Sequence, residues 1–203
     1  LTHHHRDHVG GVAEVAARLD LPVLAHPATL QRLPSTDGVS LRPVEDGEAL
    51  ELGGLTALAR HTPGHAPGHI VLELPERNVV IAGDLVSGSS TIVVPDGSGD
   101  MGAYLEALDW LSRGPWRWIL PGHGPPLPPG KVRAVLEHRL DRHRRVLEAL
   151  ENTPLAAQVL AQRAYADAPA APRQLIEMQT RAHLRLLERE RKAARADGGW
   201  KRC

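Results

Sequence analysis

The chain has 203 residues, 42% of them apolar, which is enough for one substantial core and a small second domain. No stretch approaches the roughly 18 consecutive apolar residues of a membrane span, so we expect no membrane partner. The only cysteine is Cys203, which excludes an internal disulfide and favours a cytoplasmic protein. A cluster of histidines begins two residues after Leu1, with no preceding strand to hold it, so we expect that the chain is truncated at its N-terminus. A targeting signal in the missing part therefore stays an open question.

The formal net charge is zero, but the charges are unevenly distributed. Residues 1–130 carry 8 Arg against 15 Asp or Glu, a balance of −7. Residues 131–203 carry 16 Lys or Arg against 9 Asp or Glu, a balance of +7. This change of sign predicts two units, 1–130 and 131–203. The basic unit either contacts phosphate backbones or consists of solvated Arg-rich helices, and both interpretations stay open.

Hydrophobic periodicity and turn residues predict alternating helices and strands in the first unit. In chain order we expect a helix over 12–19, a strand over 22–26, a helix over 27–33, strands over 39–44 and 48–60 interrupted by turns at 46–47 and 53–54, a hairpin of strands over 70–74 and 78–82, a Gly/Ser loop over 86–100, a helix over 101–111 and a strand over 116–120.

The pattern changes after a Pro/Gly-rich loop over 121–130, which we interpret as the domain junction. A long amphipathic helix is expected over 131–150, and a second helix is expected to open at Thr153-Pro154, with Thr153 as its N-cap. A third helix over 172–195 and a short hairpin around 197–199 complete the chain. Helices followed by a basic hairpin are typical of a winged helix.

The opening segment carries the first candidate metal ligands. His3 and His5 are two residues apart, so in an extended segment both imidazoles point the same way and reach one ion. Asp7 and His8 follow at a turn and face a second ion nearby. Imidazole and carboxylate ligands suit zinc, with manganese or iron as alternatives. A purification-tag remnant explains the adjacent histidines but not the Asp-His-x-Gly-Gly that follows them.

Three further features lie near predicted strand ends. A rigid loop over 61–69, HTPGHAPGH, contains His65, and Gly83-Asp84 directly follows an apolar strand. Pro121-Gly122-His123-Gly124 follows another strand. Taken alone, Gly-Asp usually marks a turn and a lone histidine is more often structural. The four features together are far more specific, because they supply five histidines and two aspartates.

The ordered pattern HxHxDH, TPGH, GD and PGHG resembles the metallo-β-lactamase superfamily, and the details THHHRDHVGG and LPGHGPPL resemble its lactamase-beta-like protein 2 subfamily. The resemblance covers nearly the whole chain and implies an αββα sandwich, with its N-terminal strands missing here, followed by a small winged-helix-like domain. It also implies a ligand set: His3, His5 and His65 for the first metal, Asp7, His8 and His123 for the second, and Asp84 bridging both.

The implied mechanism is hydrolysis by a water that two divalent cations activate, two Zn²⁺ with Mn²⁺ or Fe²⁺ as alternatives. Asp7 and Asp84 are the candidate catalytic carboxylates. Candidates for supporting contacts to the ligand imidazoles are His69 first and then His61, Thr62 and His4, although we expect His61 and His4 to point to solvent instead. The histidines outside the motifs are interpreted as structural or surface residues: His26, His138, His143 and His183.

The substrate stays open between several classes. A small ester, thioester or lactone is the first, and the acidic 1–130 unit favours it over a polyanion. Single-stranded RNA is the second class, and the chain would then be an endoribonuclease. Aromatic residues for base stacking are scarce, however. A nucleic-acid-binding winged-helix module with an inactive metal fold, and oxygenase or persulfide chemistry at an iron site, are further alternatives. No feature of the sequence indicates the oligomeric state. The cations that could contact RNA are Arg142, Arg144, Arg145, Arg181, Arg185, Arg189, Arg191 and Lys192.

Overall fold

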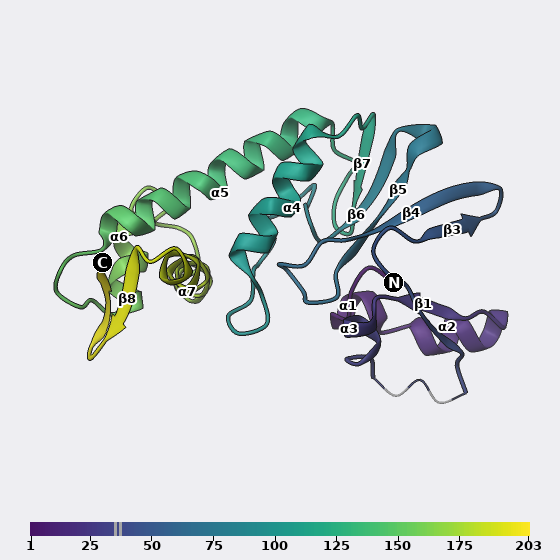
Figure 1. The fold of residues 1–203 in the computed structure, drawn as a ribbon, viewed down its shortest axis with the longest axis horizontal. Coiled ribbons are helices and arrows are strands. Elements are labelled where there is room, and N and C mark those ends of the chain that lie inside the picture. Colours follow the sequence, from purple (N-terminus) through teal and green to yellow (C-terminus); the bar gives the residue numbers. More distant parts are fainter. Residues whose placement is uncertain (35, 37) are drawn as a thin grey trace.

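The computed structural model describes residues 1–34, 36 and 38–203, which form the mixed α/β fold predicted from the sequence (Figure 1). A small parallel sheet, a five-stranded sheet and a C-terminal hairpin are connected by helices. The elements are α1 (Arg6–Val9), α2 (Val12–Leu19), β1 (Val23–Ala25), α3 (Pro27–Leu30), β2 (Leu41–Pro43), β3 (Ala49–Leu52), β4 (Leu55–His61), β5 (Ile70–Leu74), η1 (Pro75–Arg77), β6 (Val79–Gly83), α4 (Met101–Arg113), β7 (Trp118–Pro121), α5 (Pro129–Ala149), α6 (Ala157–Ala164), α7 (Arg173–Arg189), β8 (Ala193–Ala196) and β9 (Gly199–Arg202).

The five-stranded sheet buries both of its faces. Successive side chains of β5 point to opposite faces, so Val71 packs in the core that α4 and α5 cover, whereas Ile70 and Leu72 pack on the other side with Leu24 of β1. Figure 1 shows β1 and the short helices α1–α3 on one side of this sheet and α4 on the other. The layers are therefore helix, sheet, sheet and helix.

The strand order brings three loops to one edge of the large sheet. The order is β3-β4-β5-β6-β7, with antiparallel pairs except for the parallel pair β6–β7. Because β4 and β6 are both antiparallel to β5, they run in the same direction. The carboxyl ends of β4, β6 and β7 therefore meet at one edge, together with the loops that follow His61, Gly83 and Pro121.

Helix α5 connects two hydrophobic cores. Its first half contributes Val132 and Leu136 to the core of the large sheet, and its second half contributes Val146 to a second core formed with α6, α7, β8 and β9. The helix begins just before the boundary placed at residue 130, and the two-unit division and the winged-helix assignment stay predictions. Within the described residues, no helix is both long and apolar enough to cross a membrane.

The predicted α3 helix was too long. It ends at Leu30 because the following turns are tighter: the amides of Arg32 and Leu33 donate to the carbonyls three residues earlier. The predicted loop over 121–130 was also slightly too long, because Pro129 already suits the first turn of α5.

Two C-terminal helix predictions were wrong at their ends. Helix α6 begins at Ala157 rather than at Thr153-Pro154, because Leu155 pairs with Trp200 of β9 through two backbone hydrogen bonds of 2.9 Å and stays extended. Helix α7 ends at Arg189 rather than at 195, because Arg191 adopts a left-handed backbone conformation with φ of 60°. The predicted hairpin over 197–199 is confirmed as the β8–β9 turn.

Candidate metal centre

The first group of candidate ligands consists of three imidazoles from two loops. Nε2 of His3 lies 3.1 Å from Nδ1 of His5 and 3.3 Å from Nε2 of His65. The extended segment before α1 presents His3 and His5, and the loop between β4 and β5 presents His65. The three ligand nitrogens all lie within 4.8 Å of one another.

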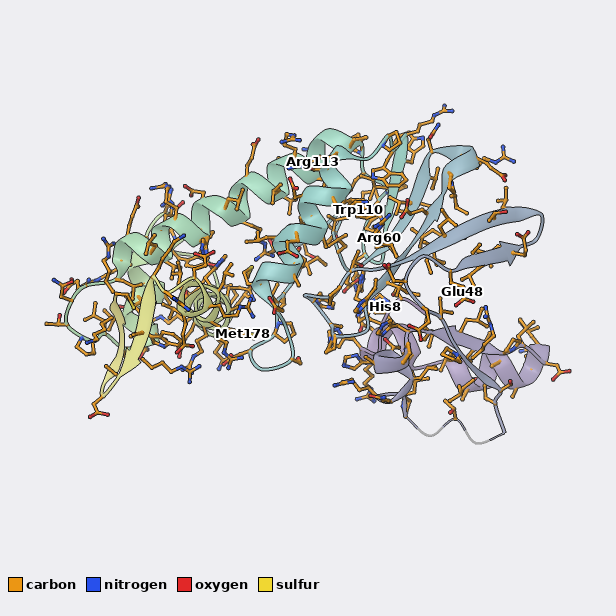
Figure 2. The ribbon with its side chains drawn as sticks, in the orientation of Figure 1. His8, Glu48, Arg60, Trp110, Arg113 and Met178 are labelled. Atoms are coloured by element: carbon orange, nitrogen blue, oxygen red, sulfur yellow. The ribbon has the colours of Figure 1, made fainter. Side chains whose placement is uncertain are left out.

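The second group joins α1 to the end of β7. Nε2 of His8 lies 3.3 Å from Nε2 of His123, which in turn lies 3.2 Å from a carboxylate oxygen of Asp7. Figure 2 shows His8 between α1 and the edge of the large sheet. The helical turn of α1 directs Asp7 and His8 towards His123, and the His8 ring also lies 4.1 Å from the ring of His3, centroid to centroid.

Asp84, directly after β6, lies between the two groups. Its Oδ1 is 3.3 Å from Nε2 of His8, and its Oδ2 is 3.5 Å from the Nε2 atoms of both His65 and His123. The structure therefore brings together all seven residues that the sequence nominated, with Asp84 in the position expected of a shared ligand.

The donor set fits a pair of divalent cations. Ligands placed about 2.0–2.1 Å from a tetrahedral zinc are themselves separated by about 3.3 Å, close to the spacings within both groups. Oδ1 of Asp84 is buried without a hydrogen-bond partner among the described residues. A Cβ built on Gly122 would overlap this oxygen and contact His8. Only glycine at position 122 therefore leaves enough space for the Asp84 carboxylate.

Burial favours the neutral form of the three imidazoles of the first group, which is the form that binds metal. Burial, reinforced by neighbouring histidines, holds the pKa of His3 far below its usual value of 6.5. Burial and then His65 lower the pKa of His5 to about 4. The pKa of His65 is also lowered, with burial as the largest cause. A neutral imidazole has one nitrogen with a free lone pair, so each of these three rings can supply one ligand atom to a cation.

His69 connects the ligand loops, but through hydrogen bonds to Thr62 and Asp84 and not, as expected, to a ligand imidazole. Its Nδ1 lies 2.8 Å from the hydroxyl of Thr62, and its Nε2 accepts a 3.0 Å hydrogen bond from the backbone amide of Asp84. Burial, His65 and His8 lower the pKa of His69 to about 3, so the ring remains a neutral acceptor. A side chain on Gly83 would collide with this ring. His69 therefore fixes the position of Asp84 through the backbone.

Two residues of the C-terminal helices support His65 and were not identified from the sequence. Nδ1 of His65 lies 2.6 Å from the carbonyl oxygen of Val93. On either side of Val93, Gln179 of α7 bonds to both the amide and the carbonyl of Val94, and Arg139 of α5 donates to the carbonyl of Ile92. Arg139 also donates to Gln179 at 2.9 Å. This network fixes the carbonyl of Val93. Because that carbonyl bonds to Nδ1 of His65, Nε2 of the same ring stays free to bind metal.

His61, expected to point to solvent, is half-buried instead. Its ring stacks on His26 with a centroid separation of 4.0 Å, and its Nε2 lies 2.8 Å from the carbonyl oxygen of Pro67. His4 is also half-buried, and its Nδ1 has no hydrogen-bond partner among the described residues. Neither belongs to a ligand group, so both act as packing residues beside the site.

Comparison with known proteins agrees with this geometry. Residues 1–123 match the family model described as the metallo-beta-lactamase superfamily. The chain belongs to this superfamily. The Caenorhabditis elegans protein named beta-lactamase-like protein 2 homolog is 30% identical over 177 residues, covering 85% of this chain and 58% of the relative. Atrochrysone carboxyl ACP thioesterase AgnL7 of Paecilomyces divaricatus is 35% identical over 153 residues, covering 74% of this chain and 46% of the relative.

The chain thus spans about half the length of the curated relatives it matches. Among solved structures, the metallo-beta-lactamase family protein TTHA1429 of Thermus thermophilus superposes with a TM-score of 0.80 at 25% identity, covering 100% of this chain and 78% of that protein. TTHA1623 in a di-iron-bound form is 35% identical with a TM-score of 0.53, covering 66% of this chain and 72% of that protein. These matches support the αββα fold.

Proposed function

We propose that the chain is a metal-dependent hydrolase that acts on a small ester, thioester or lactone. The observation that carries this proposal is the position of Asp84, whose two oxygens face two groups of ligands at once. The first metal would be held by His3, His5 and His65 and the second by Asp7, His8 and His123, with Asp84 shared. Bound divalent cations of this kind lower the pKa of a coordinated water to about 7.

The exposure of the ligand side chains defines the side from which a substrate approaches. The side chains of Asp84 and His65 are each 8% exposed, whereas those of Asp7 and His123 are 59% and 42% exposed. The substrate carbonyl therefore reaches the centre from the side of Asp7 and His123. From the buried side of the site, the carboxylate of Asp84 would orient the water that the metals activate. No side-chain nucleophile is required.

The choice of substrate rests on the names of relatives and on charge. Relatives named as acyl carrier protein thioesterases support a thioester or a related ester. The di-iron form of TTHA1623 supports a two-metal centre, while the His and Asp ligand set suits two Zn²⁺ with Mn²⁺ or Fe²⁺ as alternatives.

Single-stranded RNA is the second candidate, but the arrangement of the basic residues favours it less. Of the eight cations that could contact a phosphate backbone, all but Arg191 form ion pairs with carboxylates among the described residues. Arg185 pairs with Asp96 and Arg189 with Asp100, so part of the positive charge neutralises acidic residues of the first unit. The opposite charges of the two units therefore help to hold them together.

Metal content per chain, measured on protein purified without added metal, is the first test, followed by hydrolysis of a model thioester with and without a chelator. We expect about two zinc or manganese ions per chain and turnover that chelation abolishes. About one iron per chain would favour oxygen or persulfide chemistry instead. Metal without turnover of any ester, together with RNA binding that weakens with salt, would favour the inactive nucleic-acid-binding module.

A further inference from the structure

A cavity of about 320 Å³ lies between the loop that follows β6 and the first half of α5. This volume is in the range of small-ligand sites. Its apolar wall includes Val86, Ile92 and Val135, and the hydroxyls of Ser87 and Thr91 line it as well. The shape and lining suit a short aliphatic group with a polar end.

The charged side chains that line the cavity are all basic. Lys131 and Arg139 lie two helical turns apart on one face of α5, with His138 beside them, and no carboxylate of the described residues lines the cavity. Partial burial, followed by Arg142 and Arg139, lowers the pKa of His138, so its imidazole is neutral at pH 7. Lys131 and Arg139 therefore supply the positive charge.

Arg139 is a buried cation without a carboxylate partner among the described residues. It is 3% exposed, its guanidinium donates to the neutral oxygens of Gln179 and Ile92, and its Cζ lies 5.4 Å from the ring centroid of Tyr104. A guanidinium has five N–H donors, so donors remain for another acceptor. Because a buried charge without a counter-charge is costly, an anion that enters this cavity gains an attraction that water does not screen fully.

The cavity shares its wall with the candidate metal centre. The amide of Gly88 donates a 2.8 Å hydrogen bond to the carbonyl oxygen of His123, and the hydroxyl of Ser87 lies 3.3 Å from the same oxygen. Tyr104, which also lines the cavity, donates to the carbonyl of Leu85, the residue after Asp84. The wall is thus bonded to His123 and to the residue next to Asp84, which places the cavity beside the candidate metal centre.

We propose that this cavity binds the anionic end, a carboxylate or a phosphate, of a small aliphatic substrate; its part in turnover rests on the proposed function. Lys131 at the exposed end of the cavity pairs with the anion, and the buried Arg139 attracts it inward. The substrate class is thus narrowed to an ester or thioester that carries an anionic group beyond its reactive carbonyl.

Calorimetric titration with hexanoate, hexyl phosphate and the neutral hexanamide tests the cavity directly. We expect one or both anions to bind and the amide to bind at least about tenfold more weakly. The variant Lys131→Gln should weaken anion binding by about tenfold, whereas Arg133→Gln, an exposed cation of the same helix that does not line the cavity, should not. Equal binding by both variants would overturn the proposal.

The titrations are repeated on chelator-treated protein, because a carboxylate or phosphate can also bind to metal. Anion binding that persists without metal and still depends on Lys131 supports the cavity even if no ester is hydrolysed. Binding that disappears with the metal places the anion at the metal centre and refutes the cavity. Esterase activity without any anion binding at the cavity would leave the proposed function standing and remove this inference.

Discussion

Two buried histidine clusters in this protein differ in what surrounds them. At the sheet edge, imidazoles from three loops converge on the carboxylates of Asp7 and Asp84. Between α5 and α7, His143 and His183 face each other with their Nδ1 atoms 3.3 Å apart, and the one carboxylate of the described residues that pairs with them is Glu190, 3.4 Å from Nε2 of His143. Burial lowers the pKa in both clusters, so a lowered pKa does not by itself indicate a metal site. The feature that indicates a metal site is the convergence of several imidazoles with a shared carboxylate on the same small region.

The largest effect is expected from removing a ligand of the first group. His65→Ala deletes an imidazole that lies 3.3 Å from His3 and 3.5 Å from Asp84, so metal content and any turnover of the model thioester should fall together. Changes to residues that only support a ligand cost about 10–100-fold in metal affinity, so we expect at least about 100-fold here. His61→Asn in the same loop is the matched control. Full occupancy of both metal sites in His65→Ala would refute the ligand assignment.

The second largest effect on metal binding is expected from adding a methyl group beside the carboxylate of Asp84. In Gly122→Ala the new Cβ overlaps Oδ1 of Asp84 and contacts His8, so the carboxylate must move. We expect metal affinity, measured by competition with a chromophoric chelator, to fall about 10–100-fold. Gly130→Ala is the control, because a Cβ there meets no atom within 4 Å and suits a helix. Unchanged affinity in Gly122→Ala would mean that Asp84 does not need its present position.

Each ligand motif could be predicted from the sequence because it lies in a short run next to a strand or turn signal. His65 in its Thr-Pro-Gly-His loop and Asp84 after an apolar strand are local patterns that need no knowledge of the fold. Their convergence follows from the strand order, which makes β4, β6 and β7 end at one edge. That order was implied by the family resemblance and did not follow from the residues alone.

The supporting network could not be predicted, because its members are distant in sequence and lie on helices where polar residues usually face solvent. Gln179 is 85 residues from Val94, and Arg139 is 47 residues from Ile92. Arg142, which we considered for RNA contact, is 6% exposed and pairs with Asp167. The helix ends were missed for a related reason: the pairing of Leu155 with Trp200 is a tertiary contact that overrides the local capping signal at Thr153.

Loss of the C-terminal support for His65 should have a smaller effect than loss of a ligand. Gln179→Ala removes both hydrogen bonds to Val94 and one partner of the buried Arg139, so Val93 and its bond to His65 become less constrained. We expect metal affinity to fall about tenfold. Gln174→Ala, an exposed glutamine of the same helix, should not change it. If the two variants bind metal equally well, the helices do not position His65.

The smallest effect concerns the second histidine cluster and depends on pH. Burial and His143 hold the pKa of His183 well below 6.5, with Arg139, Arg142 and His138 also lowering it and Glu190 facing His143. The folded state therefore keeps this ring neutral, whereas the unfolded chain takes up a proton below about pH 6.5. Stability should thus fall as the pH drops below that value, by about 1.4 kcal/mol per pH unit for one proton.

Replacing this ring should flatten the pH dependence without touching the metal centre. His183→Leu, unfolded by urea in the presence of a chelator, should lose stability less steeply than the unmodified chain below pH 6.5, and the two slopes should agree above pH 7, where both states hold a neutral ring. The chelator makes the other buried imidazoles contribute equally to both proteins. Identical slopes across the whole range would show that His183 takes up a proton as readily in the folded state as in the unfolded chain. The contrast between the two clusters would then concern their carboxylates alone.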